Sequence, residues 1–294
     1  MYNQFVGTGV ALVTPFDNSG AIDINGLINL LNHVINNKVE YLVVNGTTAE
    51  SATTTEEEKK LILQTVLEFN QRRLPIMYGL GGNNTAEIID KIKSTNFDGV
   101  DAILSVSPYY NKPSQEGIYL HYKAIAEASP IPIFLYNVPG RTSSNILPST
   151  TIRLSKISNI IGIKDANTDV SHNIEILKGV SKDFLVVSGD DMWALPLISL
   201  GGKGAISVLA DAYPLEYSNM IRHGLNNQFN EATEILKSFS ILNPLLYEEG
   251  NPVGIKTVLK EMKLCESKVR LPLANASATL VSKILEAIKS VKKA

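Results

Sequence analysis

The chain has few of the features that mark secreted, membrane-bound or nucleic-acid-binding proteins. It contains one cysteine, Cys265, so no disulfide can form within it. No apolar run approaches the roughly 20 residues that cross a bilayer, and residues 1–6 do not resemble a signal peptide. Neither sign of charge is in excess, because the formal net charge is −2, which argues against a nucleic-acid partner. We therefore expect a cytoplasmic protein with no membrane or nucleic-acid contact.

Hydrophobic residues make up 44% of the 294 residues, an ordinary balance for a globular protein with a large core. Eight short apolar runs recur at intervals of roughly 25 to 35 residues, the size of a βαβ unit. They are almost continuously hydrophobic, as are parallel strands that are covered on both faces. The runs cover residues 9–13, 41–44, 76–80, 102–106, 133–136, 160–163, 184–187 and 205–208.

An amphipathic stretch follows each of the first strands, and several of these stretches have a helix-capping residue at their start. Asp23, Asn84 and Ser114 are suitable N-caps, and Thr54 with Glu57 has the spacing of a capping box. Strand and helix patterns therefore alternate along the chain.

Eight β units without a gap favour a closed (β/α)8 TIM barrel, an α/β fold, over an open sheet. We assign residues 1–225 to the barrel. Residues 226–294 carry helical patterns, for example over 231–239 and 278–291, and no linker precedes them. We expect them to form a C-terminal helical extension packed on the barrel within one domain.

Active sites of such barrels lie on the loops that follow the strands, so polar residues at strand ends are the candidates. Lys164 ends the apolar run that begins at residue 160. Burial disfavours its ammonium form, and a neutral amine at the barrel mouth can add to a carbonyl and form a Schiff base. The alternative is a lysine that reaches solvent or pairs with Asp165.

Other strand ends carry hydroxyl groups and one guanidinium group. Tyr136 and Tyr110 end the fifth and fourth strands, and Thr47 and Thr48 follow the second. Ordered phenols can transfer protons, although a packing role is the alternative for each tyrosine. Arg141 lies in a turn and can hold a carboxylate with two hydrogen bonds, or form a surface ion pair.

Metal ligands are not grouped in the sequence. The four histidines are scattered over predicted helices without the spacing of a metal site, so we expect surface residues and no metal; they are His33, His121, His172 and His223. The glycine-rich residues 201–204 lack the spacing of a phosphate-binding loop.

Four motifs at strand ends together resemble the dihydrodipicolinate synthase family. They lie at residues 46–51 (GTTAES), 108–111 (PYYN), 136–142 (YNVPGRT) and 161–166 (IGIKDA). The match runs in order over almost the whole chain. Ala49 is a departure, because the family usually has glycine there, and a methyl group would strain the loop if a positive φ were required.

The resemblance implies a reaction between pyruvate and L-aspartate-4-semialdehyde in diaminopimelate and lysine biosynthesis, without a metal or organic cofactor. Lys164 would form the Schiff base with pyruvate, and Tyr136 would transfer protons. Thr47 would link Tyr136 to Tyr110, which a neighbouring subunit would supply. The family is usually a homotetramer, a dimer of dimers.

The resemblance also implies how the substrates bind. Thr48 would bind the pyruvate carboxylate, Gly189 and Ile206 would border the pyruvate site, and Arg141 would bind the semialdehyde carboxylate. Five residues match an allosteric L-lysine site of the family: Ser51, Ala52, Asn83, Glu87 and Tyr109. Glu56 and Lys59 stand where lysine-sensitive members carry histidines. We expect lysine inhibition to be weak or absent, because Lys59 places a cation near a cationic ligand.

A second pyruvate-dependent aldolase, such as an N-acetylneuraminate lyase or a 2-keto-3-deoxy sugar-acid aldolase, would share Lys164 and Tyr136. Arg141 and the Tyr109–Tyr110 pair favour the semialdehyde carboxylate over a polyhydroxy sugar. A non-catalytic barrel would have lost Lys164 or the tyrosines, and the chain retains them.

Overall fold

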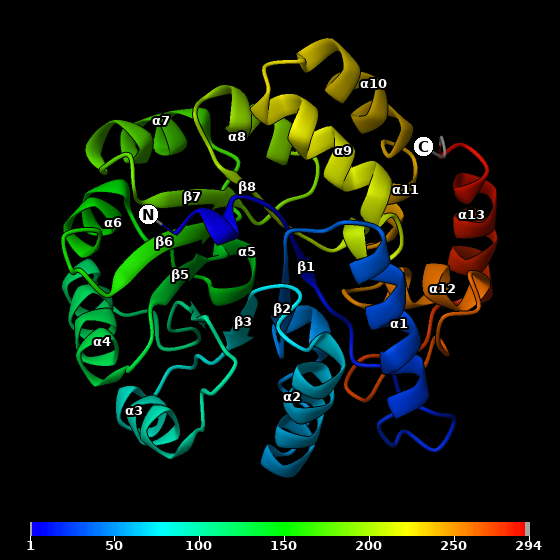
Figure 1. Ribbon diagram of the computed structural model, residues 1–294, viewed down its shortest axis with the longest axis horizontal. Helices are drawn as coiled ribbons and strands as arrows, with labels where there is room; N and C mark the ends of the chain where they lie inside the picture. The colour runs from blue at the N-terminus through cyan, green and yellow to red at the C-terminus, as the bar shows by residue number, and fades with distance from the viewer. Residues whose placement is uncertain (1, 292–294) are drawn as a thin grey trace.

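The computed structural model describes residues 2–291. Eight parallel strands form one closed barrel in chain order, and helices surround it (Figure 1), so the predicted (β/α)8 fold is confirmed. The strands are β1 Gly7–Ala11, β2 Tyr41–Val44, β3 Ile76–Gly79, β4 Ala102–Val106, β5 Ile133–Asn137, β6 Ile160–Asp165, β7 Leu185–Ser188 and β8 Gly204–Ser207.

Helices follow the strands as expected for this fold, and further helices complete the C-terminal part. The α-helices are α1 Ile24–Asn36, α2 Glu56–Asn70, α3 Thr85–Ser94, α4 Gln115–Ala128, α5 Pro139–Thr142, α6 Pro148–Leu154, α7 Val170–Gly179, α8 Ala194–Ser199, α9 Pro214–Leu225, α10 Phe229–Ser238, α11 Leu242–Leu245, α12 Val253–Glu261 and α13 Ala278–Ile288. The 3₁₀ turns are η1 Asn3–Phe5, η2 Thr47–Ala49 and η3 Leu209–Asp211.

The predicted helix caps are confirmed except for one. The side chains of Asp23, Asn84 and Ser114 accept hydrogen bonds from the first turns of α1, α3 and α4. The capping box of α2 is formed by Thr55 and Glu58, one residue later than predicted. Residues 53–58 read TTTEEE, so the spacing fits two registers.

Two hydrophobic layers lie on opposite faces of the strands. The inner layer fills the barrel, where Phe5 packs edge-on against Tyr41 with ring centres 5.3 Å apart. The outer layer lies between strands and helices. On β5, Phe134 and Tyr136 belong to the inner layer and Leu135 to the outer layer, as the alternation of a strand requires.

The pairing of β5 with β6 contains an irregularity that decides which way Lys164 points. Ile133 pairs with Ile160, but Phe134 pairs with Gly162, so one residue of β6 is extra. This β-bulge reverses the alternation along β6. The residues after the bulge therefore bring Lys164 into register with Tyr136, an inward-facing residue.

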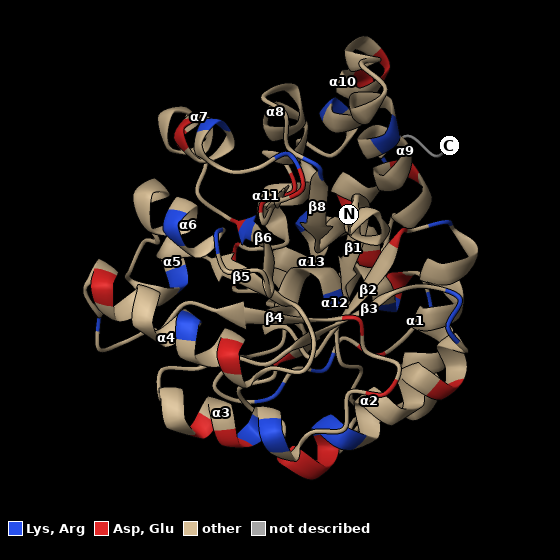
Figure 2. Cartoon of the chain, turned by 60° about the vertical axis from the view of Figure 1, so that its left-hand side comes forward, with Lys and Arg blue, Asp and Glu red and all other residues tan. Residues whose placement is uncertain are grey.

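The C-terminal helices pack on one another and on the last helix of the barrel. Helix α10 contacts α9, and α13 contacts both α11 and α12. In Figure 1, α12 and α13 lie on the same side of the molecule as α1. Lys and Arg are interspersed with Asp and Glu over the helices (Figure 2). None of the helices within residues 2–291 is long and apolar enough to cross a membrane.

Candidate active site

Lys164 is buried beside Tyr136 at the C-terminal end of the barrel. Its side chain is 6% exposed, and its Nζ lies 4.3 Å from the centre of the Tyr136 ring. The two residues are direct neighbours in the pairing of β6 with β5. Asp165 bonds to other groups, His172 and Asn137, so the alternative pairing of Lys164 with Asp165 is absent. A buried amine next to a phenol can form a Schiff base and exchange protons.

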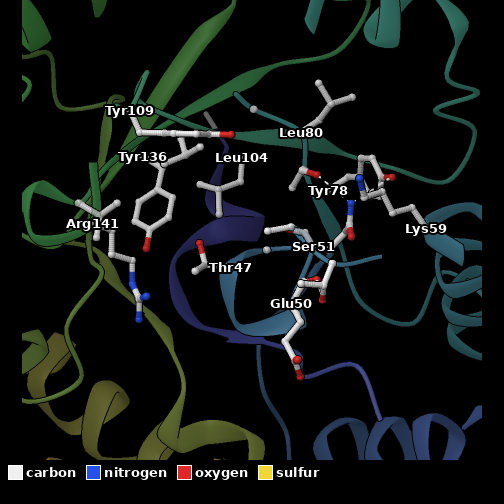
Figure 3. A pocket seen from close by; sticks show the side chains of 18 of the residues that line it. Thr47, Glu50, Ser51, Lys59, Tyr78, Leu80, Leu104, Tyr109, Tyr136 and Arg141 are labelled. Atoms are coloured by element: carbon white, nitrogen blue, oxygen red, sulfur yellow. Dashed lines mark hydrogen bonds between the residues drawn. The ribbon is translucent and has the colours of Figure 1, made fainter. Parts of the chain in front are cut away.

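Tyr136, Thr47 and Arg141 line one cavity of about 550 Å³. Figure 3 shows the Thr47 hydroxyl facing the phenol of Tyr136, with Arg141 beside that phenol. Tyr136 on β5 and Arg141 on the adjoining α5 follow one strand, whereas Thr47 on η2 follows β2, far from them in the chain. The structure thus brings Thr47 to the two residues that were predicted at the end of the fifth strand.

Gly189 lies against the side chain of Lys164, and Ile206 lies in the inner hydrophobic layer. Gly189 follows β7, and a Cβ atom at this position would lie 3.1 Å from Cε of Lys164. Ile206, on β8, is buried in the inner layer together with Tyr136. The glycine leaves the space that the lysine side chain occupies.

The loop after β2 forms a 3₁₀ turn that presents Thr47 and Thr48. The hydroxyl of Thr48 accepts a 3.0 Å hydrogen bond from Nδ2 of Asn251, a residue of the C-terminal extension. Ala49 lies inside the turn, whereas the left-handed backbone conformation falls on Glu50, with φ of 55°. The methyl group of Ala49 therefore causes no strain.

A buried ion pair that the sequence did not predict holds this loop. Nζ of Lys256 lies 2.6 Å from Oε1 of Glu50, and both side chains are almost completely buried. The other carboxylate oxygen accepts a hydrogen bond from the backbone NH of Arg270. Burial lowers the pKa of Lys256, and Glu50 opposes that shift. The signal in the sequence was a lysine inside the otherwise apolar start of α12.

Tyr110 is not brought to Thr47 within one chain. Its side chain is 90% exposed at the tip of the loop after β4, where φ is 73°. Its neighbour Tyr109 lines the cavity. The structure therefore places Tyr109 at the site and leaves the hydroxyl of Tyr110 to the outside.

Three of the residues predicted for a lysine site, Ser51, Ala52 and Tyr109, line the same cavity. Lys59 also lies there, away from Arg141 (Figure 3), and pairs with Glu56 at 2.9 Å. The two remaining predicted residues, Asn83 and Glu87, are not among the lining residues. Asn83 donates to the carbonyl of Tyr109, and Glu87 pairs with Lys91 on α3.

The prediction that the histidines are surface residues is wrong for two of them, although all four lie on helices as expected. His121 is buried, and burial lowers its pKa to about 4. His172 is buried with Nε2 2.9 Å from Oδ2 of Asp165. His172 thus faces a residue of β6, whereas His121 contacts the hydroxyl of Thr85 on the neighbouring helix α3 at 2.8 Å. Within residues 2–291, no three His, Cys, Asp or Glu side chains group as a metal site.

Comparison with known proteins gives consistent matches over nearly the full length. Residues 4–291 match the Dihydrodipicolinate synthetase family. The 4-hydroxy-tetrahydrodipicolinate synthase of Cytophaga hutchinsonii is 55% identical over 285 residues, 97% of this chain and 96% of that relative. The enzyme of the same name from Flavobacterium psychrophilum is 49% identical and covers 95% and 96%. A solved dihydrodipicolinate synthase from Acinetobacter baumannii, complexed with pyruvate, is 37% identical with a TM-score of 0.94 and covers 97% and 98%.

Proposed function

The chain belongs to the dihydrodipicolinate synthetase family, and from this premise we propose that it condenses pyruvate with L-aspartate-4-semialdehyde. The product is 4-hydroxy-tetrahydrodipicolinate, an intermediate of diaminopimelate and lysine biosynthesis. The observation that carries the chemistry is the burial of Lys164 against the Tyr136 ring at the mouth of the barrel.

In the proposed reaction, the amine of Lys164 adds to the ketone of pyruvate, and water leaves to give a protonated imine. Loss of a proton from the methyl group gives an enamine, whose carbon attacks the aldehyde. The amine of the second substrate then displaces Lys164 by transimination and closes the ring. Tyr136 is the proton carrier, since its phenol borders the cavity that also contains Thr47.

The substrate carboxylates are assigned to two residues, one on the turn after β2 and one on α5. Thr48 would bind that of pyruvate, with Gly189 and Ile206 as walls around Lys164. Arg141 would bind that of the semialdehyde with two hydrogen bonds. Arg141 is exposed and lines the cavity, and no carboxylate within the described part of the chain forms an ion pair with it.

Trapping of the imine tests this assignment. The protein is incubated with pyruvate, reduced with borohydride and mapped by mass spectrometry, and turnover with the semialdehyde is then measured. We expect an adduct on Lys164 that is lost in Lys164→Met, together with turnover. An adduct without turnover would favour an N-acetylneuraminate lyase or a sugar-acid aldolase, and absence of an adduct would contradict Schiff-base chemistry.

We further propose a dimer in which each subunit supplies Tyr110 to its neighbour, and a tetramer of two such dimers. The support is the 90% exposure of Tyr110 beside a cavity that lacks it. Mixing inactive Lys164→Met with impaired Tyr110→Phe tests the exchange. Mixed dimers would contain one site with both native residues, so activity should rise above that of either variant. An unchanged rate after subunit exchange would exclude the sharing of Tyr110.

Weak or absent inhibition by L-lysine also stays a proposal. The ammonium of Lys59 already pairs with Glu56, and Glu56 lies 3.5 Å from a second ammonium, that of Lys91. A bound lysine would therefore add a cation where the carboxylates are already paired. Titration calorimetry should detect no tight lysine binding.

A cytoplasmic location and the domain boundary at residue 225 are likewise proposals. The boundary is supported by the end of α9 at Leu225.

A further inference from the structure

Asn137 and Asp165 form a second side-chain pair directly beside Tyr136 and Lys164. They are the next pair in the register of β5 with β6, so their side chains point to the outer face of the barrel. Nδ2 of Asn137 donates to Oδ1 of Asp165 at 2.9 Å, and both side chains are fully buried. The pair of Asn137 and Asp165 thus joins β5 and β6 directly next to Tyr136 and Lys164, which carry the proposed chemistry.

This pair lies on the far side of the β-bulge in β6. A slip of one residue between paired strands turns every side chain to the other face, and the bulge itself is such a shift of register. Only with the bulge in place does Lys164 point into the barrel beside Tyr136. The hydrogen bond from Asn137 to Asp165 is formed in the register that follows the bulge.

Further contacts extend the pair to two neighbouring elements. Oδ2 of Asp165 lies 2.9 Å from Nε2 of His172 on α7. Oδ1 of Asn137 accepts from the backbone NH of Ile146, and its Nδ2 also donates to Asn145. The segment between Asn137 and Ile146 carries Arg141. One buried network therefore connects the strand of Lys164, the strand of Tyr136 and the loop of Arg141.

We propose that Asn137, Asp165 and His172 are positioning residues. Their hydrogen bonds keep Lys164 beside Tyr136 and keep the loop that carries Arg141 in place. This inference rests on the proposed Schiff-base function. None of the three side chains touches the reacting atoms in this arrangement. Their contribution is to fix the register of the strands and the path of the loop, through hydrogen bonds that are removed from water and are correspondingly strong.

Exchange of the two side chains is the sharpest test. Asn137→Asp places one carboxylate against another and removes the donor. We expect the rate of borohydride-trapped pyruvate adduct to fall about ten- to a hundredfold, as for other small displacements of reacting groups, and KM for the semialdehyde to rise. The double variant Asn137→Asp, Asp165→Asn again pairs one amide with one carboxylate and should recover most of the adduct rate.

Asn70→Asp is the matched control, because Asn70 is also a buried asparagine with two hydrogen bonds, to Leu74, but it precedes β3 at the opposite end of the barrel. It should lower thermal stability without changing the adduct rate or KM. If Asn137→Asp does not fold, His172→Leu and His172→Gln replace it. The leucine variant loses the bond to Asp165 and should be slow, whereas the glutamine amide keeps a donor and should be close to wild type.

The outcomes separate the two proposals. A wild-type protein that forms no adduct would overturn the proposed function. A wild-type protein that reacts, with Asn137→Asp or His172→Leu folded and equally fast, would overturn the positioning role alone. A folded exchange variant that stays as slow as Asn137→Asp would also overturn it, because the restored pair would then be without effect.

Discussion

Gly189 shows how much depends on the space around Lys164. A methyl group at Gly189 would lie 3.1 Å from Cε of Lys164 and 3.0 Å from Cβ of Ala166, closer than ordinary contact. We expect Gly189→Ala to displace the lysine and to slow pyruvate adduct formation by about tenfold or more, as measured by borohydride trapping. Gly140→Ala is the control, because its added methyl group would meet nothing within 4 Å. Equal rates in the two variants would contradict this role.

We expect the buried ion pair between Lys256 and Glu50 to contribute to the stability of the protein. Lys256→Met leaves the buried carboxylate of Glu50 without its cation, which should lower the free energy of unfolding by about 3 to 5 kcal/mol. Urea denaturation measures this value. The double variant Lys256→Met, Glu50→Gln should recover part of the loss, because no charge is left buried. Lys237→Met breaks an exposed pair with Glu234 and should cost at most about 1 kcal/mol.

At the residue scale, the sequence predicts a site residue where its position at the end of a single strand is enough to identify it. Lys164 and Tyr136 stand out because each polar group ends an apolar run. The pair of Glu50 and Lys256 could not be found in this way, since its members are 206 positions apart. His121 and His172 were misplaced for a related reason. Their burial depends on partners, Thr85 and Asp165, that a helical pattern does not identify.

At the scale of secondary structure, the bulge in β6 depends on Gly162. A Cβ atom there would lie 2.4 Å from the ring of Phe134 and 2.6 Å from the carbonyl oxygen of Leu185. We expect Gly162→Ala to cost about 1 to 3 kcal/mol of stability, as overpacking does, and to reduce adduct formation in the fraction that is folded. Chemical denaturation and borohydride trapping measure the two effects.

Gly82→Ala is the comparison for this change, because its methyl group would make only ordinary contact with Ile88, at 3.6 Å. It should leave both quantities near wild type. A stable Gly162→Ala protein with a normal rate of adduct formation would show that β6 reaches its register without the glycine.

The strands were predictable as elements, but the bulge was not. Parallel strands covered on both faces are hydrophobic throughout, so residues 160–163 carry no alternation from which a change of phase could be recognised. The inward direction of Lys164 therefore followed from the structure, whereas its position at a strand end followed from the sequence. For α2, the run of three threonines and three glutamates fits two positions of the capping box, so the sequence does not decide between them.

At the scale of the whole molecule, His121 should make stability depend on pH. Burial lowers its pKa from the ordinary histidine value of 6.5 to about 4 in the folded state. Between these values the unfolded chain binds a proton that the folded chain does not. Stability is therefore unaffected above pH 6.5 and falls as the pH is lowered towards 4, by about 2 kcal/mol at pH 5.

His121→Asn removes the titrating group and should flatten the stability profile between pH 6.5 and 5, measured by urea denaturation at several pH values. Most carboxylates do not titrate in that window, so the difference between wild type and variant isolates the histidine. Parallel profiles for wild type and His121→Asn would contradict the assignment.

The sequence predicts helices for the C-terminal extension, but it does not predict the contacts of this extension with the loop after β2. Asn251 binds Thr48, while Lys256 and Arg270 bind Glu50. During synthesis the loop after β2 is made early, whereas the three residues that bind it are made near the end. A nascent chain that stops before residue 251 would thus contain Lys164 but lack the residues that bind Thr48 and Glu50, so the loop after β2 gains its final surroundings only when synthesis is almost complete.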